Sequence, residues 1–325
     1  MSRYRDQVAA ALRAVAIRGP LSYAWLGRPS RGLSPGLHLD LSPALLRREL
    51  VACLREELYW SFYCHGEPVP ARWREPEPPS PDPGLLADLS AANTGLGSWE
   101  DGWTVRRLDG EVAVVDGPRL RMRVPVGDCS GEVRTGGAVA VRLPKELPAR
   151  SPGFFTVLGD AATGASGGDV RVYWNVTRAG APRLVRELSS WLNPAGVPFA
   201  LKVADHPHRL DRRDAAVLYV EAARFPALRP RLGELAASLR DRLGPGVPAF
   251  TLELAPGVGL AEDDSGESFG QRRCAQLADG IVRAHERALT SLGDRVEAVV
   301  ERFAQDGVRI DAPYLDPALA GRHVL

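Results

Sequence analysis

The sequence predicts an α+β protein in which a mainly antiparallel or mixed sheet is flanked by helices and preceded by an N-terminal helical region. Three observations support this prediction. Apolar residues recur at helical spacing within the first 62 residues, short alternating segments follow from residue 102, and later strand-like segments alternate with helical ones. A meander of short strands favours antiparallel pairing, whereas the later alternation places helices against the faces of the sheet.

The first part of the chain is predicted to be helical. Val8, Leu12 and Val15 lie at helical spacing within residues 4–16, and a longer helix is expected up to residue 62 after the Ser42-Pro43 start signal. Residues 66–84 contain seven prolines, which is typical of an extended spacer. We therefore divide the chain into a helical region at 1–64, a proline-rich linker at 65–84 and an α+β domain at 85–325.

The α+β domain is predicted to start with a meander and to continue with alternating strands and helices. Short strands are expected at 102–107, 111–115, 119–124 and 138–143. The clearest strand is 170–176, where valines and a tryptophan alternate with Arg171, Tyr173 and Asn175. Further strands are expected at 198–203, 215–220 and 250–254, and further helices at 182–192, 231–243, 271–290 and 294–305.

Composition limits the classes of function. The 325 residues are 45% hydrophobic and 25% charged, as in ordinary globular proteins, and the net charge of +1 provides no general field to attract nucleic acid. No segment has the apolar length of a membrane span. The four cysteines lack the C-x-x-C spacing of metal sites, and the N-terminus does not resemble a signal peptide. We expect a cytoplasmic protein with free thiols, without nucleic-acid or membrane partners.

Lysine usage draws attention to one strand. The chain has 41 lysines and arginines, and only Lys145 and Lys202 are lysines. In the segment 198–203, Lys202 is expected on the face opposite Phe199 and Leu201. Arginine stays protonated at any working pH, whereas a desolvated lysine can lose its proton and act as a base. Lys202 is therefore a candidate general base, and the alternative is a strand-end lysine whose ammonium group extends to solvent.

Several further cationic residues are candidates for phosphate binding. Arg171 lies on the polar face of its strand, Arg213 and Asp214 precede another strand, and Arg273 lies in the first turn of a helix. Arginine side chains bind phosphate through two parallel donors. The alternative is ordinary ion pairing with the 40 acidic residues. The loop with Asp205, His206, His208 and Asp211 offers metal-type ligands, but a solvated loop is the favoured interpretation because no distant cluster completes a site.

Several motifs occur together in one order. They are Ser90-Ala-Ala-Asn-Thr-Gly95, Pro144-Lys-Glu-Leu-Pro148, Ser151-Pro-Gly-Phe-Phe155, Arg171-Val-Tyr-Trp-Asn175, Pro198-Phe-Ala-Leu-Lys202, Arg213-Asp-Ala-Ala-Val-Leu-Tyr219, Gly259-Leu-Ala-Glu262 and Glu267-Ser-Phe-Gly-Gln-Arg272. Together they resemble the HopA-type effector domain family over about residues 85–289. This family takes its name from a plant-pathogen type III effector and recurs in pathways that make peptide natural products.

The resemblance implies an activity. In the pathway branch, such proteins are similar to the lyase component of a split dehydratase for class V lanthipeptides and thioamitides. A separate kinase-like protein would phosphorylate serine or threonine of a precursor peptide. This protein would then eliminate phosphate to leave dehydroalanine or dehydrobutyrine. Such an elimination needs a base, cations for the departing phosphate and donors for enolate-like charge, but no metal or organic cofactor.

The residues receive roles on this basis. Lys202 is the expected base, Lys145 the acid or a second phosphate contact, and Asp214 the residue that orients an arginine. The phosphate- and substrate-binding set is Arg171, Tyr173, Asn175, Arg213, Ser268 and Arg273, and Tyr219 joins the catalytic set as a donor. Two alternatives remain. One is a non-catalytic module that binds a leader peptide or the kinase, and the other is a secreted effector, which would need a disordered export segment where a helix is expected.

Overall fold

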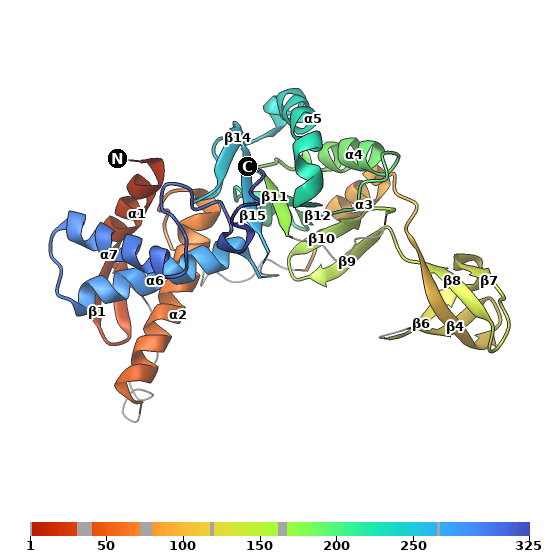
Figure 1. The fold of residues 1–325 in the computed structure, drawn as a ribbon, viewed down its shortest axis with the longest axis horizontal. Coiled ribbons are helices and arrows are strands. Elements are labelled where there is room, and N and C mark those ends of the chain that lie inside the picture. The colour runs from red at the N-terminus through yellow and green to blue at the C-terminus, as the bar shows by residue number, and fades with distance from the viewer. Residues whose placement is uncertain (1, 31–40, 72–79, 118–119, 162–167, 265–266) are drawn as a thin grey trace.

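A seven-stranded antiparallel sheet forms the centre of the molecule (Figure 1). The computed structural model describes residues 2–30, 41–71, 80–117, 120–161, 168–264 and 267–325. The strand order is β14-β15-β11-β13-β12-β10-β9. The strands are β9 (Glu146–Ser151), β10 (Phe154–Leu158), β11 (Asp169–Trp174), β12 (Phe199–Ala204), β13 (Ala216–Glu221), β14 (Leu252–Ala255) and β15 (Val258–Asp263). Three of the six adjacent pairs, β14 with β15, β12 with β13 and β9 with β10, are neighbours along the chain, and the other three join strands that are farther apart in sequence.

Three helices cover one face of this sheet. They are α3 (Pro83–Ala92), α4 (Ala181–Leu192) and α5 (Phe225–Ser238). Their apolar sides and the alternate residues of the strands, such as Val172, Leu201 and Leu218, form one hydrophobic core. The alternation of the strands therefore places the remaining side chains, including Arg171 and Lys202, on the opposite face.

The opposite face is covered over only part of its width. Helices α1 (Arg3–Ala14), α2 (Pro43–Ser61), α6 (Phe269–Glu286) and α7 (Leu292–Gln305) pack together, with a small sheet of β1 (Val15–Gly19), β2 (Ser22–Trp25) and β3 (Arg28–Pro29) beside them. Their core takes in Tyr173, Val217 and Ala261 from strands β11, β13 and β15. The other end of this face, formed by β12, β10 and β9, lies outside that core.

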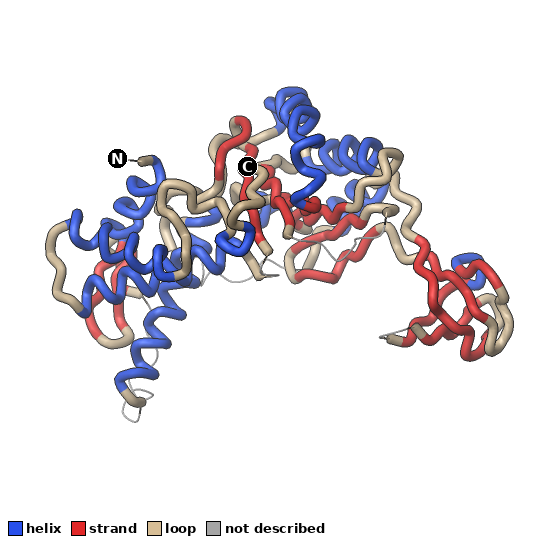
Figure 2. The backbone as a smooth tube through the Cα atoms, viewed as in Figure 1, coloured by secondary structure: helices blue, strands red, loops and turns tan. Residues whose placement is uncertain are grey.

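A separate five-stranded sheet projects from the rest of the molecule, at the right of Figure 2. Its order is β6-β5-β4-β8-β7, from β4 (Trp99–Asp109), β5 (Val112–Asp116), β6 (Arg121–Pro125), β7 (Cys129–Gly131) and β8 (Ala138–Arg142). It has its own core, which includes Trp103 and Val141. The chain enters and leaves at one point, where the amide of Leu143 donates to the carbonyl of Ser98 at 2.7 Å.

Short 3₁₀ turns complete the described secondary structure. They are η2 (Tyr63–His65), η3 (Val126–Asp128), η4 (Pro207–Leu210), η5 (Ala222–Arg224), η6 (Arg240–Arg242) and η7 (Pro317–Leu319). All four cysteines are free. Within the described residues, no helix combines the length and the apolar character that crossing a bilayer would require.

The predicted α+β class is confirmed. Most predicted helices and strands are present, but the strand predicted at 250–254 is the start of a hairpin, β14 and β15, joined at Gly257. The helix predicted from residue 231 starts at Phe225, with Pro230 inside it. The predicted domain boundaries stay a prediction. Of the proline-rich linker at 65–84, residues 72–79 lie outside the described part of the chain.

Candidate functional site

Lys202 lies on the uncovered end of the central sheet. It belongs to β12, between β10 and β13, where it is paired with Thr156 on one side and Val217 on the other. Phe199 and Leu201 are buried in the core on the far face. The side chain of Lys202 therefore projects from the face that helices α1, α2, α6 and α7 leave open at this end.

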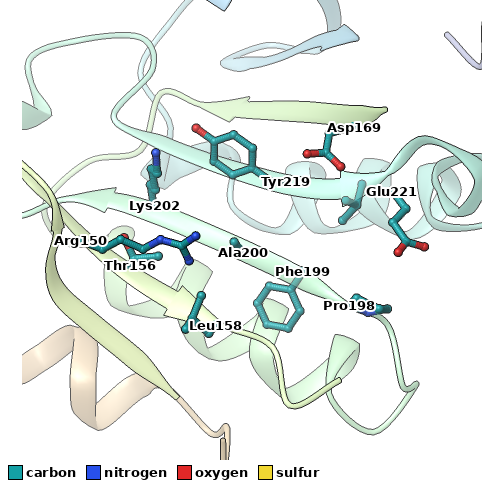
Figure 3. Close-up of a pocket in the computed structure, with 11 residues that line it drawn as sticks. Arg150, Thr156, Leu158, Asp169, Pro198, Phe199, Ala200, Lys202, Tyr219 and Glu221 are labelled. Atoms are coloured by element: carbon teal, nitrogen blue, oxygen red, sulfur yellow. The ribbon is translucent and has the colours of Figure 1, made fainter. Parts of the chain in front are cut away.

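A pocket of about 330 Å³ opens on this face (Figure 3). Lys202, Arg150, Thr156 and Tyr219 line one part of it, and the carboxylates of Asp169 and Glu221 line the other, with Leu158, Pro198, Phe199, Ala200 and Val220 between them. The pocket therefore has a cationic part and an acidic part. A ligand with an anionic group is expected to bind at the first of these.

The ammonium group of Lys202 makes no hydrogen bond or ion pair with any residue that the structure describes, and it lies 5.2 Å from the centre of the Tyr219 ring. Burial lowers the pKa of Lys202, and the positive charges of Arg171 and then Arg150 lower this pKa further. A lower pKa increases the neutral fraction at any given pH. The side chain thus has the main property required of a general base.

Arg171 is a fixed charge behind Tyr219. Its guanidinium carbon lies 5.3 Å from the centre of the Tyr219 ring, on the strand next to β13. It forms an ion pair with Asp263 at 2.6 Å and donates to the carbonyl of Glu267 at 2.5 Å. Burial raises the pKa of Tyr219, although Arg171 opposes this effect, so the phenol stays protonated. Arg171 therefore acts on Lys202 through its charge, and it does not line the pocket.

Two of the predicted site residues, Tyr173 and Ser268, lie outside the lining of the pocket. Tyr173 is buried, and its ring centre lies 6.4 Å from that of Phe269. Ser268 caps helix α6 by accepting a hydrogen bond from the amide of Gln271 at 3.4 Å. Tyr173 therefore belongs to the interior and Ser268 to the exposed start of α6, and neither residue lines the pocket.

Three predicted residues lie in loops away from the pocket. The ammonium group of Lys145 donates to the carbonyl of Asn93 at 2.8 Å. Arg213 forms an ion pair with Glu67 at 2.6 Å. The amide group of Asn175 donates to a backbone carbonyl in the loop before β14 at 2.9 Å. The structure does not bring these three side chains to Lys202, and their predicted roles stay predictions.

The two remaining predicted residues are buried and hold the fold. Asp214 accepts two hydrogen bonds from Arg212, at 2.5 and 2.6 Å, so the arginine that it orients is Arg212. Arg273 is fully buried and donates to the carbonyls of Pro313 and Leu315 at 2.8 and 3.0 Å. Burial, helped by Arg272, lowers the pKa of Arg273 to about 10. Its guanidinium group holds the segment after α7 and does not reach the pocket.

Four polar pocket residues were missed by the sequence interpretation: Arg150, Thr156, Asp169 and Glu221. The alternation of Phe155, Thr156 and Val157 was a usable signal for Thr156, since the two neighbours are buried in the core. No sequence signal placed Arg150, because the register between β9 and β10 shifts between Phe154 and Thr156.

The loop after β12 shows no metal-type arrangement. The rings of His206 and His208 stack with their centres 5.2 Å apart, and Asp205 forms an ion pair with Arg209 at 2.5 Å. Among the residues that the structure describes, no three histidine, cysteine, aspartate or glutamate side chains gather as a metal site requires.

Comparison with known proteins assigns the family. The model of the HopA1 effector protein family matches residues 146–315, about half of the chain. The chain belongs to this family. The predicted HopA-type membership is therefore confirmed. The HopA1 match starts with β9 and ends at Leu315, so it contains the whole pocket. It starts later and ends later than the predicted range of 85–289, and Lys145 lies one residue outside it.

Two solved structures of Pseudomonas syringae effector proteins are similar to the chain. The effector protein from Pseudomonas syringae pv. tomato strain DC3000 is 17% identical, with a TM-score of 0.48, and the alignment covers 83% of this chain and 95% of that one. The effector protein from Pseudomonas syringae pv. syringae strain 61 is 19% identical, with a TM-score of 0.39, and the alignment covers 52% and 66%. No curated protein matches the chain.

Proposed function

We propose that this member of the HopA1 effector protein family is a phosphoserine/phosphothreonine lyase. It would eliminate phosphate from a precursor peptide that a separate kinase-like protein has phosphorylated, and leave dehydroalanine or dehydrobutyrine, in class V lanthipeptide or thioamitide biosynthesis in the cytoplasm. One observation carries the proposal. Lys202, whose pKa is lowered by burial and by Arg171 and Arg150, faces an open pocket without an ion-pair partner among the described residues.

The groups of the pocket and the substrate account for every proton and electron pair of the proposed elimination. The neutral amine of Lys202 takes the proton from Cα of the phosphorylated residue, and the electron pair of the Cα–H bond forms the Cα=Cβ double bond. The Cβ–O bond breaks, and its electrons leave with the phosphate. Lys202 ends as an ammonium group and then returns its proton to solvent. No redox partner is needed, and no metal or organic cofactor enters the scheme.

Neighbouring groups assist each stage. The protonated phenol of Tyr219 lies next to Lys202 and can donate a hydrogen bond to the enolate-like oxygen that develops as Cα loses its proton. Arg171 is held by Asp263 and Glu267, so its charge keeps a constant position during the reaction. A fixed positive charge favours the neutral amine before proton transfer and the departing phosphate after it.

The test is direct. The full-length chain is incubated with a peptide carrying phosphothreonine or phosphoserine, and mass spectrometry follows the loss of phosphoric acid. We expect this loss from phosphorylated peptide, no reaction with the unphosphorylated peptide, and no effect of a metal chelator. A folded sample that binds the phosphopeptide or the kinase but leaves the phosphate in place would refute the lyase and support the non-catalytic binding module.

A further inference from the structure

Thr156 has an unusual environment for a hydroxyl group. It lies in β10 directly opposite Lys202, on the same face of the sheet, and lines the pocket. Its side chain is fully buried, and Oγ1 has no hydrogen-bond partner among the residues that the structure describes. A buried polar group without a partner carries a free-energy penalty, which a ligand oxygen can remove. The hydroxyl of Thr156 is therefore available to donate a hydrogen bond to an acceptor atom of a bound ligand.

Arg150 is the second group without a partner. It is exposed, lies in β9, and forms no hydrogen bond or ion pair with any described residue, whereas Arg171 and Arg212 are bound to carboxylates. Figure 3 shows its side chain extending into the pocket from the β9 side, near Thr156 and Lys202. A guanidinium group can bind two oxygens of one tetrahedral anion through parallel donors.

We propose that Arg150 and Thr156, together with Lys202, form a subsite for a tetrahedral oxyanion, the phosphate group of the substrate, an inference that rests on the proposed lyase function. Arg150 donates to two phosphate oxygens and the Thr156 hydroxyl to a third. This arrangement places the leaving group beside the base. In a β-elimination the abstracted proton and the leaving oxygen lie on adjacent carbons, so the base and the phosphate subsite have to be neighbours.

The acidic part of the pocket supports this location. Asp169 is paired with Glu221, which lies four residues along β13 from Val217, the partner of Lys202. Two strand spacings and four residues of strand separate the Cα atoms of Asp169 and Lys202 by about 15 Å. The carboxylates of Asp169 and Glu221 therefore repel an anion from the far end of the pocket and leave the Lys202 end as the favourable position.

Binding of inorganic phosphate tests the subsite without any turnover. Isothermal titration calorimetry on the full-length chain compares wild type with Arg150→Ala, Thr156→Val and Thr156→Ser. We expect Arg150→Ala to weaken phosphate binding at least about tenfold and Thr156→Val about threefold, because each removes a hydrogen bond to a charged group. Thr156→Ser keeps the hydroxyl and should stay within about twofold of wild type.

A matched control is Arg183→Ala. Arg183 is another exposed arginine, in α4 on the opposite side of the sheet, paired with Glu187 at 4.0 Å. Its removal should leave phosphate binding unchanged. An equal loss of phosphate binding in this control would show a general charge effect and would overturn the subsite. Wild-type affinity for phosphate in both single variants, Arg150→Ala and Thr156→Val, would overturn it as well.

The same variants separate this inference from the lyase proposal. Phosphate binding that depends on Arg150 and Thr156, in a protein that never releases phosphate from peptide, would support the subsite and refute the lyase. Elimination by wild type, with phosphate binding unaffected in both variants, would refute the subsite and support the lyase.

Discussion

Positively charged side chains at the two ends of one sheet face differ in whether they form ion pairs. Under α2 and α6, Arg171 is paired with Asp263 and Arg212 with Asp214. At the open end, Lys202 and Arg150 have no ion pair with a described residue. Buried charges have to be paired for the fold to be stable. Charges that stay unpaired in a pocket, despite 40 acidic residues in the chain, are better explained by a ligand.

This comparison leads to three predictions, in order of decreasing free-energy effect. The largest concerns the covered end. Asp214→Ala leaves Arg212 buried without its carboxylate, although Arg212 still donates to the hydroxyl of Tyr59 at 3.0 Å. We expect the free energy of unfolding to fall by about 3 to 5 kcal/mol. Denaturant unfolding followed by circular dichroism measures the change.

The control for this prediction is Asp241→Ala, which removes an exposed ion pair with Arg242 at 3.4 Å. Its effect on the free energy of unfolding should stay below about 1 kcal/mol. If both variants unfolded at the same denaturant concentration, the Arg212 pair would not stabilise the fold as we describe.

The second prediction concerns Lys202 at the open end. Lys202→Arg keeps the positive charge but cannot supply a neutral base, so phosphopeptide should still bind while elimination slows at least about a hundredfold, equivalent to roughly 2.7 kcal/mol. Single-turnover kinetics by mass spectrometry measure the rate, and thermal denaturation verifies the fold. A variant with the wild-type rate would move the role of base to another residue.

The third and smallest effect is a shift of the pH profile. The base works when it is deprotonated, so the rate should rise with pH through the pKa of Lys202. Arg150→Gln removes a positive charge that lowers this pKa. The rising limb should therefore move to higher pH, by less than about one unit. It is measured on kcat at saturating phosphopeptide, where weaker binding has no influence. Arg183→Gln should leave the limb in place, and a shift to lower pH would contradict the arrangement.

Local patterns in the sequence predicted much of this arrangement. The alternation in β11 and β12 predicted Arg171 and Lys202 on the faces of their strands opposite the apolar residues, and the helices at both ends of the chain follow from apolar spacing. The hairpin of β14 and β15 was missed as such because every residue of β15 is buried, which removes the alternation that marks a half-exposed strand.

The sequence could not separate structural arginines from site arginines. Arg171 belongs to a motif and Arg273 directly follows another, yet their partners, Asp263 and the carbonyl of Pro313, are brought to them by tertiary packing. Arg150 follows no motif and reaches the pocket through an irregular pairing of β9 with β10. Residue type and spacing predict which chemistry is available, but the distances between strands far apart in sequence decide which groups meet.

The five-stranded sheet has an evolutionary consequence. Its first and last strands, β4 and β8, pair with each other, and the amide of Leu143 is bonded to the carbonyl of Ser98, so the chain departs and returns at nearly the same place. A module attached in this way can grow, shrink or be exchanged between relatives while a short turn closes the junction. The HopA1 match starts at Glu146, three residues after Leu143. The module can thus change in length or sequence while the strands that line the pocket stay unchanged.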